Sequence, residues 1–101
     1  MQVDRGDQPQ EVRPSVDQFI TRHGKAEITI TVVPGGWKVQ YTCAGRLFGP
    51  RVCLYEAVHA EARHAAWDVM CRVIRATDDE EAGVLAGRNA SHWLMEHSSV
   101  Y

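Results

Sequence analysis

Two adjacent segments with strictly alternating apolar and polar residues constrain the fold of this chain most strongly. Apolar residues occupy every second position through residues 27–33 and again through residues 37–43, and Pro34-Gly35-Gly36 lies between the two segments. Such alternation is typical of strands with one buried and one solvated face. A Pro-Gly pair between two such segments is typical of a tight turn. We therefore predict an antiparallel hairpin whose threonine, lysine and glutamine side chains face water.

Helices are predicted on both sides of this hairpin. Residues 14–23 begin with Pro14-Ser15 and carry apolar residues at helical spacing, and Gly24 suits the left-handed residue that ends a helix. Residues 55–76 carry a longer apolar stripe, with Asp68 and Arg72 spaced for an i,i+4 ion pair. Because the middle of this stripe is rich in alanine, we expect the second helix to lie close to the sheet.

The C-terminal segment is predicted to cover the second apolar face of the helix at 55–76. Thr77 and Glu80 have capping-box spacing, which favours a helix start at this point. Gly83 and Gly87 lower the helix propensity by up to about 1 kcal/mol each relative to alanine. We therefore expect this helix to break near Gly87.

These elements define a single α+β domain over residues 14–101, preceded by a flexible leader at residues 1–13. A third strand is expected over residues 47–54, interrupted at Gly49-Pro50 because proline cannot donate to a central ladder. The predicted fold is a three-stranded antiparallel sheet with helices on one face. Its order is α-β-β-β-α, followed by the C-terminal helical segment.

The composition favours a cytoplasmic protein. The N-terminus lacks the apolar core of a signal peptide, and no apolar run approaches the ~20 residues of a membrane span. The three cysteines show no CxxC spacing, so reduced thiols are expected.

No cofactor, metal or catalytic constellation is expected. His59 and His64 are five residues apart, so on one helix they would point in different directions rather than converge on a metal. Cys71 has no base placed near it by the sequence. We therefore predict that the protein is not an enzyme.

The order helix, three strands, helix resembles the double-stranded-RNA-binding domain. That family opens its second helix with a K-K-x-A-K-x-x-A-A motif, and the similar segment here is His59-Ala60-Glu61-Ala62-Arg63-His64-Ala65-Ala66. The resemblance covers about residues 14–76. It implies a fold that grips duplex RNA through phosphate and 2′-hydroxyl contacts, with Arg63 as the positive charge at this motif. In size and composition the chain is also similar to small proteins of phages and mobile elements, including anti-CRISPR inhibitors.

Charge is unevenly distributed along the chain, although the net charge is only −2. Residues 24–54 carry four basic residues against one acidic residue, and residues 78–101 carry five acidic residues against one basic residue. Arg46 and Arg51 flank the third predicted strand. The acidic run at 78–81 is interpreted as a helix start or as a surface that faces a partner.

The tryptophans complete the set of candidate contact residues. Trp37 and Trp67 are assigned to the core, and Trp93 is the expected interface anchor, because tryptophan is enriched at binding hot spots. The full set of partner-binding candidates is Trp93, Arg46, Arg51, Arg63, His59, Asp78, Asp79, Glu80 and Glu81.

We therefore predict a non-enzymatic protein-interaction module, an inhibitor or adaptor that docks on a larger assembly. The alternative is a double-stranded RNA- or DNA-binding domain that uses the basic sheet region and Arg63. A protein partner is expected in the first case, and self-association into a homodimer is left open.

Overall fold

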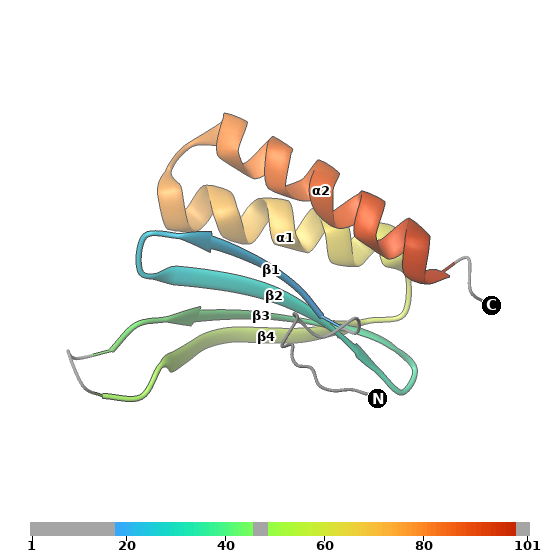
Figure 1. Cartoon of the computed structure of the whole chain (residues 1–101), viewed down its shortest axis with the longest axis horizontal. Helices are drawn as coiled ribbons and strands as arrows, with labels where there is room; N and C mark the ends of the chain where they lie inside the picture. The colour runs from blue at the N-terminus through green and yellow to red at the C-terminus, as the bar shows by residue number, and fades with distance from the viewer. Residues whose placement is uncertain (1–17, 46–48, 99–101) are drawn as a thin grey trace, which may run out of the picture.

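The computed structural model describes residues 18–45 and 49–98, in which a four-stranded antiparallel sheet is followed by two helices. The elements are β1 (Gln18–His23), β2 (Ala26–Val33), β3 (Gly36–Cys43), β4 (Val52–His59), α1 (Ala62–Thr77) and α2 (Glu80–Ser98). The strands lie side by side in chain order, and both helices cover the same face of the sheet (Figure 1). The predicted leader lies outside the described residues. The α+β class is confirmed, whereas the number of strands was wrong.

The central hairpin forms as its alternation predicts. Ile30 of β2 pairs with Val39 of β3, and both are fully buried beneath the helices. The other face of the sheet, which we call the outer face, carries polar side chains that pair with one another. Gln18 Nε2 donates to Thr31 Oγ1 over 3.2 Å, and Gln40 Nε2 donates to Glu56 Oε1 over 3.1 Å.

The first predicted helix is a strand in the part that the structure describes. Residues 18–23 form β1, which pairs along its whole length with β2. Gly24 has a φ of 61°, so its positive φ serves the two-residue hairpin turn between β1 and β2 rather than a helix end. Both structures require the same glycine. Aromatic and β-branched residues at 19–21 favour the strand.

The second predicted helix begins later than expected, because residues 55–59 continue strand β4. Tyr55, Ala57 and His59 lie opposite helix-facing residues of β3, whereas Glu56 and Val58 lie on the outer face. Helix α1 begins at Ala62, and its N-cap residue Glu61 makes no side-chain capping bond. The helix start therefore has no capping signal in the sequence. The second part of the third predicted strand, residues 52–54, begins β4, and residues 47–48 lie outside the described residues. A register shift after Tyr41 leaves Leu54 unpaired.

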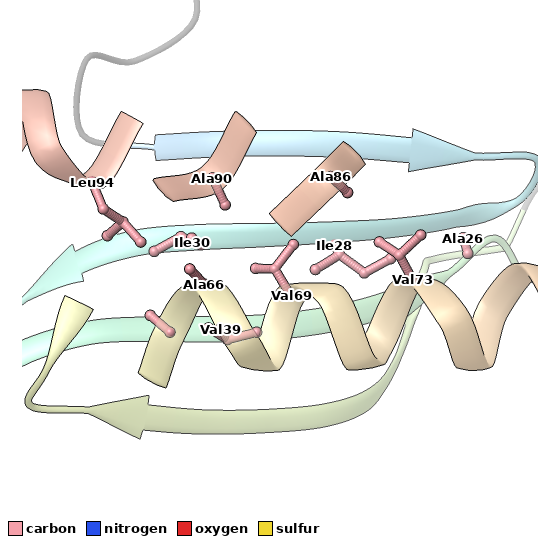
Figure 2. Packing of buried hydrophobic residues seen from close by; sticks show 11 residues of the cluster. Ala26, Ile28, Ile30, Val39, Ala66, Val69, Val73, Ala86, Ala90 and Leu94 are labelled. Carbon is pink, nitrogen blue, oxygen red and sulfur yellow. The ribbon is translucent and has the colours of Figure 1, made fainter. Parts of the chain in front are cut away.

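The core lies between the sheet and the two helices. Figure 2 shows its members converging from β2, β3, α1 and α2: Ala26, Ile28, Ile30, Val39, Ala66, Val69, Val73, Ala86, Ala90 and Leu94. Ala65 and Ala66 are buried, which confirms the predicted close approach of α1 to the sheet. Helix α1 contacts all four strands, whereas α2 contacts α1 and β1.

Helix α2 is continuous from Glu80 to Ser98. The break expected near Gly87 is therefore wrong. Its two glycines are buried against α1. A Cβ added at Gly83 would overlap Ile74 Cγ1, and a Cβ added at Gly87 would lie 3.1 Å from Met70 Cβ. Because glycine has no side chain, the two helices can approach closely at these positions. The tertiary packing gained in this way offsets the low helix propensity of glycine.

We expect Gly83→Ala to destabilise the domain by about 1–3 kcal/mol, because the added methyl group overpacks the contact with Ile74. Helix propensity alone predicts that this substitution stabilises the domain, because alanine favours the helix more than glycine does. Urea unfolding followed by circular dichroism measures the change. Asn89→Ala, at an exposed position of the same helix, is the matched control and should be neutral or slightly stabilising. Equal stabilisation by both substitutions would contradict the close contact.

Candidate protein-binding surface

A buried carboxylate organises the polar side chains between β4 and α1. Asp68 is 6% exposed, and its Oδ2 accepts a hydrogen bond of 2.8 Å from the Tyr55 hydroxyl. His59 Nε2 lies 2.7 Å from the same oxygen. Arg72 Nε is 3.3 Å from Asp68 Oδ1 and forms an ion pair without hydrogen-bond alignment, which confirms the predicted i,i+4 pair.

This cluster stabilises the junction of sheet and helix. The Arg72 guanidinium also lies over the Tyr55 ring, 4.1 Å from its centroid, in a cation–π contact. A buried carboxylate is costly unless it is hydrogen-bonded and charge-paired, and Asp68 has both kinds of partner. The arrangement therefore holds the edge strand β4 against α1.

The surroundings of the Tyr55 phenol shift its pKa. Burial, followed by the hydrogen bond to Asp68 and the charge of that carboxylate, raises the pKa of Tyr55 above its usual value of 10.0. The nearby Arg72 opposes this shift. The folded protein therefore favours the neutral phenol, which donates to Asp68.

We expect the free energy of unfolding to fall as the pH rises above about 10, the usual tyrosine pKa. The pKa of Tyr55 is raised in the folded state, so its contribution is fully present below the unfolded pKa and is lost as the pH rises through the folded one. Tyr55→Phe should flatten this alkaline decline, measured by urea unfolding at a series of pH values. Tyr41→Phe is the control, since the Tyr41 hydroxyl does not contact Asp68. An unchanged decline in Tyr55→Phe would contradict the assignment.

The histidine and cysteine side chains considered in the sequence lie on three different elements, β3, β4 and α1. Within residues 18–45 and 49–98, no group of three histidine, cysteine, aspartate or glutamate side chains could hold a metal ion. His59 is engaged by Asp68, and His64 is exposed on α1. The cysteines are free thiols; Cys43 and Cys53 pair with different residues across the β3–β4 ladder.

Three adjoining hollows lie along α1 and α2 and define what we call the helical groove. Their volumes are about 310, 210 and 360 Å³. The first and second share Val84 and Arg88, and the second and third share Arg63 and Ser91, so each hollow lies next to the following one. The apolar lining comes from Trp67, Met70, Val84, Leu85, Leu94 and Met95.

Large apolar side chains are exposed along this groove. Trp67 is 65% exposed and Met95 is 68% exposed, and Val84 and Leu85 are also exposed. The assignment of Trp67 to the core was therefore wrong. Its position on α1 points it away from the sheet, because the opposite side of the helix supplies the buried Ala65 and Val69. The sequence did not reveal this exposure, because a tryptophan at the margin of an apolar stripe gives the same pattern whether it is buried in the core or exposed on the surface.

Trp93, the predicted anchor, is half-buried against the core. Its ring lies 6.2 Å from Phe19 and 3.9 Å from His97, measured between ring centroids. His97 Nδ1 lies 2.8 Å from the Trp93 carbonyl oxygen and so holds the end of α2 together. Trp93 therefore offers less surface to a partner than Trp67 does.

The predicted basic residues of the described chain divide between the outer face of the sheet, which carries Lys38 and Arg51, and helix α1, which carries Arg63. Arg51 Nη2 donates to the carbonyl of Lys25 at the end of the sheet, and Lys38 lies on the outer face opposite Val58. Arg63 lies on α1 and donates to Glu61 Oε1 over 2.9 Å. Arg46 lies outside the described residues.

The acidic run at 78–81 connects the helices. Asp78 ends α1 with a left-handed φ of 57°, and Asp79 Oδ1 accepts bonds from the Glu81 and Ala82 amides at the start of α2. The capping residue is therefore Asp79 rather than Thr77, whose hydroxyl donates to Val73 O inside α1. Glu80 and Glu81 remain exposed at one end of the helical groove.

No protein-family model, curated protein or solved structure matches this chain. In the described residues, neither helix is both long and apolar enough to pass through a membrane.

Proposed function

We propose that the protein is a non-enzymatic interaction module that binds a partner protein in the helical groove. The observation that carries this proposal is Trp67, whose ring is mostly exposed and lines the middle hollow of the groove. Tryptophan is a common hot-spot residue, and an exposed apolar groove rimmed by polar residues is typical of an interaction site.

The lining of the groove, which comes from two neighbouring helices, favours an amphipathic helix as the docking segment. Such a helix lays residues at i, i+3, i+4 and i+7 into an apolar groove between two helices. Trp67 and Met95 provide apolar surface, and Arg88, exposed between them and the acidic end, favours an acidic side chain beside the apolar face of the partner. Glu80 and Glu81 favour a basic residue at the opposite end of the segment.

The outer face of the sheet is a less suitable surface for this role. Its polar side chains pair with one another, as in the Arg22 Nε–Glu27 Oε2 ion pair of 2.8 Å and the Arg51 Nε–Thr42 Oγ1 bond of 3.0 Å. A partner on this face would have to replace existing hydrogen bonds, whereas a partner in the helical groove covers apolar surface that is already exposed.

A photo-crosslinking amino acid at Ser91, inside the groove, tests the proposal in an extract of the native host. We expect a discrete protein adduct that is lost when Trp67→Ser is added. The affinity should fall by about thirty-fold or more, because hot-spot truncations cost about 2 kcal/mol or more. Because Trp67 is largely exposed, Trp67→Ser should change the unfolding free energy by only about 0.5 kcal/mol. The same probe at Thr31, on the outer face, is the matched control.

Two results would contradict the proposal. An adduct of equal yield from Thr31 would show that contact is not confined to the groove. Binding of duplex RNA at micromolar protein, decreasing steeply with salt and with Arg63→Ala, would favour the nucleic-acid alternative instead.

A further inference from the structure

Strand β4 forms one edge of the sheet. Within the described residues it pairs with β3 on one side only. Its exposed side chains include Val52, Leu54 and Val58, and Leu54 and Val58 are 56% and 57% exposed. Edge strands are normally protected by lysine, by proline, by short length or by a covering element. β4 has eight residues with no lysine and no proline, and only the irregularity at Leu54 interrupts it.

The opposite edge of the sheet, strand β1, differs in length, in charge and in the helix that covers it. β1 is shorter, with six residues, and it carries Arg22 and Gln18 on the outer face. Helix α2 also packs against β1, whereas it makes no comparable contact with β4. The two edges of the sheet are therefore unequal, and among the residues that the structure describes β4 is the less covered edge.

We propose that β4 pairs antiparallel with β4 of a second copy of this chain, about a two-fold axis at Ala57. This pairing forms a continuous eight-stranded sheet. In this register Glu56 of each copy lies opposite Val58 of the other, and Tyr55 lies opposite His59. Opposite residues of an antiparallel pair share a face, so the outer and helix-facing sides continue unbroken across the junction.

Charge complementarity favours a second copy and this register. Lys38 lies beside Val58 on the outer face, and Gln40 lies beside Glu56. The pairing therefore places Lys38 of one copy and Glu56 of the other in the same cross-strand row, with Val58 of the first copy between them, once on each side of the axis. A register centred on Glu56 would oppose two like charges and is disfavoured. Ala57 at the axis presents the smallest side chain of the regular part of β4.

The dimer has a consequence for the whole molecule. A two-fold axis perpendicular to the sheet leaves the helices of both copies on the same side, so the two helical grooves face the same direction. The inference does not depend on the proposed function, since β4 contributes no residue to the groove. An interface built mainly from one strand pair is smaller than the standard of about 800 Å² per partner. We therefore expect association in the micromolar range or weaker.

Sedimentation equilibrium of the full chain over a range of concentrations tests the pairing with two variants of one residue. Val58→Lys places a cation opposite Glu56 of the other copy and should strengthen the dimer, whereas Val58→Glu places a carboxylate there and should weaken it. Because each pair occurs twice, the two dissociation constants should differ by about ten-fold or more. Glu56→Lys combined with Val58→Glu should restore association.

Within one copy, the two substitutions are expected to affect the stability of the monomer in the opposite order to their effect on the dimer. A change in folding therefore cannot be mistaken for a change in association. Val58→Glu lies beside Lys38 of its own chain and should not destabilise the monomer, whereas Val58→Lys lies beside a like charge. Thermal unfolding of both variants checks this. A monomer at all concentrations, or equal weakening by both substitutions, would overturn the proposal. A groove adduct from Ser91 that persists in a strictly monomeric protein would leave the proposed function standing while overturning the dimer.

Discussion

The close packing of α2 against α1 is the constraint on which the rest of the structure depends. Gly83 and Gly87 present no side chain to Ile74 and Met70, so the two helices approach closely enough to share one core with the sheet. Small residues on the inner side of α2, including Ala86 and Ala90, complete this contact. Because two glycines and two alanines occupy the inner side, the larger apolar residues of α2 are divided between the core and the surface, and Val84 and Leu85 remain exposed.

The same geometry forms the helical groove. A pair of closely packed helices leaves a shallow depression along its outer side, and here Trp67 lies beside that depression with little cover of its own. Beneath the helices, the Asp68 cluster holds β4 against α1 by hydrogen bonds and an ion pair. The residues with the most distinctive chemistry, a histidine and a carboxylate in contact, therefore stabilise the fold, and the proposed contact surface consists of ordinary apolar side chains.

Much of the sheet could be predicted, because alternation and turn residues are local signals. The hairpin at 27–43, the buried alanines of α1 and the Asp68–Arg72 pair all follow from sequence spacing. The errors fall where two structures share one signal. Gly24 suits a helix end and a hairpin turn equally. The apolar residues of segment 55–59 fit both the helical repeat and the two-residue repeat of a strand. Glu61 is a poor capping residue, so nothing local marked the true start of α1. For the candidate site, Trp67 is exposed although a core position was predicted, since exposure depends on which side of a helix faces the core.

The sequence by itself determined a small α+β domain with a half-solvated antiparallel sheet and a helix rich in alanine beside it. These properties depend on residues close together in the chain, where side-chain periodicity and turn chemistry act directly. Only the tertiary structure decided that four strands form, that α2 continues through its glycines, and that Trp67 faces solvent. Each of these outcomes depends on contacts between distant segments: β1 with β2, Gly83 with Ile74, and the sheet with one side of α1. Their packing energy exceeds the local preferences that predicted otherwise.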